Sequence, residues 1–251
     1  MARPFDPTLV PLPDGQIRIY FTSNRSPDLQ RSPLAIYSAI SSDGVRYTFE
    51  PGVRFTIEGR LVIDCAVALH NGLFHLIVPD NGTVADMHRQ QRNREPPRGG
   101  NGYHAVSRDG LNFERVADVI NPAGDHWLGN LVSDGAGLAF FVTGRGTWPL
   151  RSQDGAAWRA DENAFRIPGA DPGAVRLRDG SWLIVVTGPP RPGTPSAERK
   201  PRPMARCSRS APPIRNFCGT RAKRWYSRTT TTWPRASTAT ISMSTRTPFW
   251  C

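Results

Sequence analysis

The chain has 251 residues and a formal net charge of +11, a balance that suggests a nucleic-acid partner until it is divided along the sequence. Residues 1–190 carry 19 Arg and no Lys against 20 acidic residues, whereas residues 191–251 carry 13 basic residues and a single acidic one, Glu198. The basic excess therefore lies in the C-terminal segment alone, and no run of 18 apolar residues is present to span a membrane.

A ten-residue phrase that opens with Asp-Pro and closes with Asp-Gly occurs at 6–15 and again at 171–180. Including two weaker copies, the phrase begins at residues 6, 64, about 128 and 171. Each copy is followed by a strand-like run, and these runs cover 17–22, 73–78, 138–143 and 182–187. Asp-Gly or Asn-Gly between apolar runs is typical of a β-hairpin, because the turn needs positive φ.

A second phrase, Ser-x-Asp-Gly-x-x-aromatic, occurs three times, at 41–47, 107–113 and 152–158. Together the two phrases predict a unit of four short antiparallel strands. Such a unit, repeated every 43 to 64 residues, is typical of β-propeller blades. We therefore predict an all-β, five-bladed β-propeller whose last blade is missing or scrambled.

The end of the chain does not match its beginning. Residues 191–251 contain no Leu, Val or Asp, so they cannot supply ordinary core strands. Two interpretations stay open: a disordered basic tail, or a reading-frame error that replaced the fifth blade. Either one predicts blades one to four (the fourth in part) over 1–190 and a separate tail over 191–251. A reading-frame error would make the basic charge an artefact, and nucleic-acid binding by a real tail is the least favoured hypothesis, so no nucleic-acid partner is predicted.

Cysteine spacing points to no disulfide framework or metal site. Cys65 lies in a predicted inner strand and is expected to be a buried thiol, and the other three have no characteristic spacing: Cys207, Cys218 and Cys251. The sequence requires no cofactor, although a structural calcium ion in the channel stays open. There is no signal peptide, but the start of the chain is itself uncertain, so localisation and oligomeric state are not assigned.

The residues that open each blade are the first candidates for chemistry. Blade geometry predicts that Asp6, Asp64 and Asp171 ring one mouth of the central channel, where neighbouring carboxylates raise one another's pKa and suit general acid–base work. The competing interpretation is structural, since Asp before a strand often bonds backbone amides in a turn. Asp125 and His126 precede the third inner strand and are expected to join the ring.

Further substrate-binding candidates lie around this mouth. Trp127 is expected either to stack on a sugar or to pack between blades. Asn24 and Arg25 lie in the loop after the first blade's second strand, which returns to the mouth. An Arg-rich insertion at 81–100 is expected to be a solvated loop on the same side. Carboxylates rimmed by Arg would suit a hydroxyl-rich or partly anionic ligand.

The combination of Asp-Pro-x-x-Val-x-Leu-x-Asp-Gly, a strand ending in Thr, and Ser-x-Asp-Gly-x-x-aromatic resembles the five-bladed propeller glycosidases. These are the relatives of arabinanases, xylosidases, levansucrases and invertases, and the resemblance covers about residues 4–190. The aromatic turn is also similar to the sialidase Asp box, which has one more residue between Asp and Gly. The motifs are blade motifs, so they indicate the fold better than the reaction.

The resemblance implies roles for the opening carboxylates. In that family an Asp from the first blade is the base or nucleophile, a second Asp orients the sugar and tunes the pKa, and a later-blade Glu is the acid. By position Asp6 matches the first and Asp64 or Asp125 the second. Asp171 holds the later-blade position in place of Glu. We therefore expect a glycosidase, and keep as the alternative a non-catalytic propeller that binds carbohydrate or a protein.

Overall fold

The computed structural model describes residues 4–25, 32–93, 99–160, 164 and 166–188. All of these residues belong to one compact unit. The segment 191–251 lies outside the described residues. The division of the chain at residue 190, the reading-frame hypothesis and the scrambled fifth blade therefore stay predictions.

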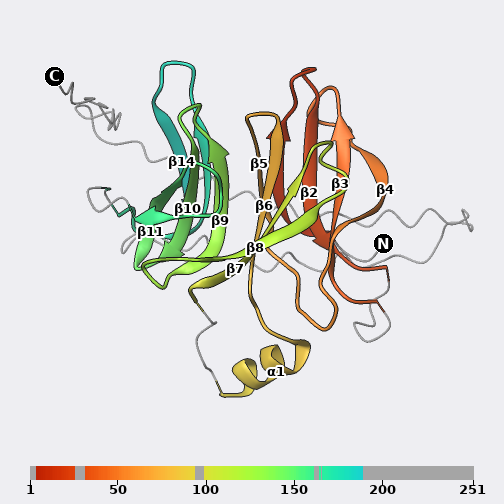
Figure 1. The fold of residues 1–251 in the computed structure, drawn as a ribbon, viewed down its shortest axis with the longest axis vertical. Coiled ribbons are helices and arrows are strands. Elements are labelled where there is room, and N and C mark those ends of the chain that lie inside the picture. Colours follow the sequence, from red (N-terminus) through yellow and green to blue (C-terminus); the bar gives the residue numbers. More distant parts are fainter. Residues whose placement is uncertain (1–3, 26–31, 94–98, 161–163, 165, 189–251) are drawn as a thin grey trace, which may run out of the picture. The chain divides into compact units, whose positions relative to one another are not determined.

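Antiparallel sheets follow one another along the chain, and in each sheet every strand pairs with its sequence neighbours (Figure 1). The first blade consists of β1 (Phe5–Pro11), β2 (Ile17–Ser23), β3 (Ala35–Ser41) and β4 (Thr48–Phe55). The second consists of β5 (Ala66–His70), β6 (Leu73–Pro79), β7 (Asn101–Ser107) and β8 (Glu114–Ile120). The third consists of β9 (His126–Ser133), β10 (Leu138–Gly144), β11 (Gly146–Ser152) and β12 (Arg159–Ala160). The fourth is described through β13 (Ala170–Arg176) and β14 (Trp182–Thr187).

The inner strands of successive blades contact one another in chain order, β1 with β5, β5 with β9, and β9 with β13. This arrangement confirms the all-β fold of four-stranded antiparallel blades. A ring that closes on itself is not found among the residues that the structure describes.

The hairpin between β5 and β6 shows why the Asn-Gly signal works. His70 pairs with Leu73, which leaves a two-residue turn, and Asn71 and Gly72 have φ values of 50° and 76°. Two consecutive positive φ angles define the type I′ turn, whose twist matches that of the flanking strands. The local sequence alone therefore determines this hairpin.

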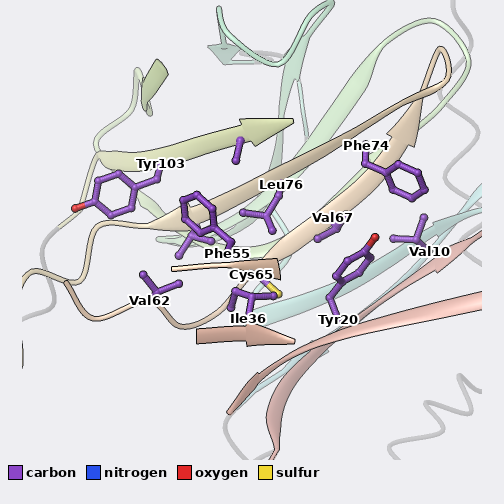
Figure 2. Packing of buried hydrophobic residues seen from close by; sticks show 12 residues of the cluster. Val10, Tyr20, Ile36, Phe55, Val62, Cys65, Val67, Phe74, Leu76 and Tyr103 are labelled. Carbon is purple, nitrogen blue, oxygen red and sulfur yellow. The ribbon is translucent and has the colours of Figure 1, made fainter. Parts of the chain in front are cut away.

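Each blade buries its faces against its neighbours rather than within itself. Figure 2 shows Tyr20 of β2 among Val67, Phe74 and Leu76 of the second blade, in a cluster that joins blades one and two. The opposite face of β6 contributes Ile77 to a second cluster, shared with the third blade. A strand of this kind is apolar on both faces, which is why 73–79 reads as a continuous hydrophobic run.

The Ser-x-Asp-Gly turn of one blade docks on the preceding blade. Ser107 closes the turn by accepting the Gly110 backbone N–H at 2.9 Å. Two residues of β2 then reach across to turn carbonyls: Tyr20 donates its hydroxyl to Gly110 O at 2.9 Å, and Arg18 donates to Asp109 O at 2.8 Å. The turn thus satisfies two buried polar side chains of the blade before it.

At the boundary between the second and third blades, two buried histidines lie under the corresponding turn, where Arg18 and Tyr20 lie at the first boundary. His75 of β6 and His104 of β7 stack with ring centroids 5.3 Å apart, and their nitrogens Nδ1 and Nε2 lie 3.1 Å apart. The Gly155 turn of the third blade covers them. Burial, followed by the repulsion of the neighbouring ring, lowers the pKa of His104 to about 4, and burial lowers that of His75 as well.

The insertion between β6 and β7 is not a loop over 84–93, and there the expectation from its composition was wrong. It contains the helix α1 (Val84–Asn93), none of whose side chains is buried. Thr83 and Asp86 form a capping box: the Thr83 hydroxyl accepts the Asp86 N–H at 3.1 Å, and the Asp86 carboxylate accepts the Thr83 N–H at 2.9 Å. This local signal outweighs the density of Arg in the segment.

We expect Gly110→Ala to destabilise the protein more than Gly44→Ala. Both glycines have φ +70° in equivalent turns, so both substitutions incur the left-handed strain of about 1–2 kcal/mol. A Cβ at Gly110 would also lie 2.6 Å from the Tyr20 hydroxyl, whereas the nearest atom at Gly44 is 3.4 Å away. The added clash should lower the free energy of unfolding by about another 1–3 kcal/mol in urea titrations. Equal losses in the two variants would show that the turn does not hold the blades together.

We also expect the histidine pair to make the protein sensitive to acid. An unfolded histidine takes up its proton near pH 6.5, but His104 resists until about pH 4, so its contribution to stability is complete above pH 6.5 and declines as the pH falls towards 4. Replacing His104 with Leu should flatten this part of the stability–pH curve. The exposed His88 of α1 provides the control, since His88→Gln should leave the slope unchanged.

Candidate functional site

Three of the predicted site residues meet at one cavity of about 250 Å³. Its lining consists of four dipeptides, one from the start of each inner strand: Asp6-Pro7, Asp64-Cys65, Leu128-Gly129 and Asp171-Pro172. The structure thus brings Asp6, Asp64 and Asp171 together. The third blade contributes Leu128 at the corresponding place.

The backbone of all three aspartates is left-handed. Their φ angles are 49°, 60° and 46°, and Asn71 is the one other non-glycine with positive φ among the residues that the structure describes. In blades one and four the cause is visible in the ladder, because the Asp-Pro pair bulges out between residues that remain in register. Strained backbone of this kind persists only where the surroundings impose it, and it is enriched at functional sites.

The three carboxyl groups differ in their environment. Asp6 and Asp171 are exposed, whereas Asp64 is partly buried. Burial, with additional contributions from a hydrogen bond to Asp6 and from the negative charges of Asp6 and Asp171, raises the pKa of Asp64 to about 8. At neutral pH the middle carboxyl therefore keeps its proton. Burial also raises the pKa of the adjacent Cys65 thiol, which is a free, buried cysteine as expected.

Threonines at the ends of second strands contact these aspartates. Thr22 Oγ1 accepts the backbone N–H of Asp64 at 3.3 Å, and Thr143 Oγ1 accepts that of Asp171 at 3.0 Å. Thr187 donates its hydroxyl to the Asp171 carboxylate at 3.2 Å. Sequence reasoning noted the strand-closing Thr as part of a motif but gave it no role; its recurrence beside a repeated Asp was the available signal.

Asp125 does not join the ring of carboxylates at the cavity. Its Oδ2 accepts a hydrogen bond from Trp148 Nε1 at 2.7 Å, and Arg166 lies 3.8 Å from the same oxygen. The ladder between β9 and β10 is irregular at this point, so Leu128, three residues later, reaches the cavity instead. His126 is partly buried and does not line the cavity either.

Trp127 lies in the core and has no exposed surface. Its ring packs edge-on against Phe140 at 4.9 Å and against Trp158 at 5.3 Å, and its Nε1 donates to Gly100 O at 3.2 Å. A ring enclosed in this way cannot stack on a sugar. The structure therefore supports the second expectation for this residue, packing between blades.

No described arginine lines the cavity. Asn24 is buried, and Arg25 is exposed with its backbone N–H bonded to Ser32 Oγ at 2.7 Å; neither lines the cavity. Arg89 of α1 pairs with Asp86 on its own helix. The described charged groups of the lining are carboxylates, and three of the arginines expected at the rim, Arg31, Arg94 and Arg98, lie outside the described residues, so the basic rim stays a prediction.

Within the described part of the chain, no three His, Cys, Asp or Glu side chains are arranged to hold a metal ion. No described helix is long and apolar enough to span a membrane.

No protein-family model and no curated protein sequence matches the chain. Solved structures do match. A family 117 glycoside hydrolase, Zg3597 of the marine bacterium Zobellia galactanivorans, is 12% identical with a TM-score of 0.58, over 73% of this chain and 62% of that one. The GH32 beta-fructofuranosidase BmSUC1 of Bombyx mori is 13% identical with a TM-score of 0.50, over 72% of this chain and 42% of that one.

These similarities confirm, at the level of the fold, the resemblance to the five-bladed propeller glycoside hydrolases. At identities of 12% and 13% they carry no information about individual site residues. The matched part spans less than two thirds of each of these two structures.

We expect Asp64→Asn to change how stability depends on pH. Asn tolerates the left-handed backbone, and it cannot ionise. In the wild-type protein, Asp64 releases its proton near pH 3.8 when the chain is unfolded and near pH 8 when it is folded. The free energy of unfolding therefore falls as the pH rises between these two values. Asp64→Asn should be more stable than wild type by up to a few kcal/mol at the alkaline end and equal to it in acid. Asp14→Asn, in an exposed turn, is the control. If the free energy of unfolding of Asp64→Asn still falls with rising pH as in wild type, a group other than Asp64 causes this dependence.

Proposed function

We propose that the protein is a glycoside hydrolase that cleaves a glycosidic bond of an oligo- or polysaccharide with Asp6, Asp64 and Asp171. The observation that carries this proposal is the convergence of three carboxyl groups on one cavity, each on a strained strand-opening backbone. The propeller fold shared with glycoside hydrolases supports the same reaction class. Glycoside hydrolysis needs two carboxyl groups on opposite sides of the scissile bond.

Asp6 is proposed as the general base or nucleophile. It is exposed to the cavity, as a group that must meet the sugar or its attacking water has to be. The neighbouring Asp64 holds its proton at neutral pH and is hydrogen-bonded to Asp6. A protonated neighbour that donates a hydrogen bond to a carboxylate fixes the orientation of that carboxylate. Asp64 thus serves as the orienting carboxyl.

Asp171 is proposed as the general acid. It comes from the fourth blade, whereas Asp6 and Asp64 come from the first and second, so it is the carboxyl that can face the bond from another side. In the free protein the Thr187 hydroxyl lies 2.9 Å from Ala170 O and 3.2 Å from the Asp171 carboxyl group, so it is placed to orient this side chain. As the acid, Asp171 would pass its proton to the departing oxygen of the sugar.

We expect Asp6→Asn to abolish turnover without abolishing binding. The amide keeps the size of the side chain and tolerates the left-handed backbone, but it neither attacks carbon nor accepts a proton. Hydrolysis of aryl glycosides and of arabino-, xylo- and fructo-oligosaccharides should fall by about 10²–10⁴-fold, whereas sugar affinity by calorimetry should change little.

Asp14→Asn, in an exposed turn, should retain full activity and serves as the matched control. Turnover that survives in Asp6→Asn would remove the assignment of the base. A wild-type protein that binds these sugars and hydrolyses none of them would instead indicate a non-catalytic carbohydrate-binding propeller.

A further inference from the structure

The second strands of three blades carry a threonine as the last or the last but one residue. Thr22, Thr143 and Thr187 each pair with the inner-strand residue that precedes the irregular segment at the cavity. In blades one and four that residue directly precedes the left-handed Asp. The three hydroxyls therefore lie at the end of the blade where the cavity opens.

Two of these hydroxyls cross to the following blade. Thr22 is the last but one residue of β2 in the first blade, and its Oγ1 accepts the N–H of Asp64, 42 residues later, at 3.3 Å. Thr143 is the last but one residue of β10 in the third blade, and its Oγ1 accepts the N–H of Asp171 at 3.0 Å. Thr22 is completely buried and Thr143 partly, so neither bond is readily replaced by one to water.

The hydroxyl and the carboxyl are present together or absent together. In the second blade the second strand, β6, ends at Pro79, which has no hydroxyl. The third blade, which follows it, reaches the cavity with Leu128 instead of Asp. Across the three boundaries that the structure describes, a threonine accompanies an aspartate in two, and both are lacking in the other.

We infer that Thr22 and Thr143 are positioning residues, which hold the site aspartates of the next blade in their left-handed backbone by accepting the backbone N–H. Left-handed backbone costs a non-glycine residue roughly 1–2 kcal/mol, and an unpaired buried N–H would cost roughly 1–3 kcal/mol. The hydrogen bond therefore penalises the relaxed conformation, in which the carboxyl group would turn away from the cavity. The inference rests on the proposed function for its catalytic consequence, though not for its structural one.

The test compares Thr22→Val with Thr22→Ser in the full chain. Valine has the shape of threonine but no acceptor, whereas serine keeps the acceptor. The first readout is the ionisation of Asp64, which is monitored through the carbon-13 chemical shift of its carboxyl group. We expect Thr22→Val to lower its pKa by at least about one unit, because the carboxyl leaves its buried place beside Asp6, and Thr22→Ser to keep the wild-type value.

The second readout is kinetic. Thr22→Val should lower kcat by about tenfold with a smaller change in KM, since it misplaces a reacting group without removing a sugar contact, and Thr22→Ser should restore kcat. If Thr22→Val lowers Tm but leaves both the Asp64 titration and kcat as in Thr22→Ser, the threonine is a structural residue only and the inference fails. A wild type without turnover would overturn the proposed function, while the titration still decides the inference.

Thr143→Val and Thr143→Ser repeat the comparison at Asp171 should Thr22→Val fail to fold. Thr143 is less buried, and its loss should be tolerated better. The Asp171 carboxyl is then the titrated group. An unchanged titration curve in Thr143→Val relative to Thr143→Ser would count against the inference in the same way.

Discussion

Contact between neighbouring blades is the constraint on which both the fold and the candidate site depend. Some buried polar groups find their partners only in a neighbouring blade: the Tyr20 hydroxyl bonds to the Gly110 turn of the next blade, and the Asp64 N–H bonds to Thr22 of the preceding one. These two bonds belong to the same boundary, between the first and second blades. A change that loosens this boundary should therefore affect stability and site geometry together, even when it lies far from the cavity.

The character of the site is governed by the burial of one carboxyl group beside two others in a small space. Because Asp64 is the least exposed of the three and lies beside Asp6, it is the one that retains a proton at neutral pH. The site gives chemically identical residues different properties, through burial and hydrogen bonding alone.

Much of this organisation can be predicted from the sequence because it is local and repeated. The Asn-Gly and Asp-Gly turns determine the hairpins, and the repetition of Asp at the start of inner strands was sufficient to predict that Asp6, Asp64 and Asp171 converge. What could not be predicted depends on partners distant in sequence. Trp127 is buried by Phe140 and Trp158, and Asp125 is held by Trp148, contacts for which no local pattern exists. The helix α1 did have a local signal, the Thr83–Asp86 capping box, which its many arginines obscured.

The helix α1 has a different relation to the fold from the strands around it. It follows the end of β6, the end of the blade at which the cavity opens, and it buries no side chain. Its sequence can therefore drift, lengthen or be exchanged at little cost to the core, whereas the strand-opening aspartates are fixed by their neighbours. Over evolutionary time such an insertion could change in length and sequence while the blades and the cavity between them stay the same.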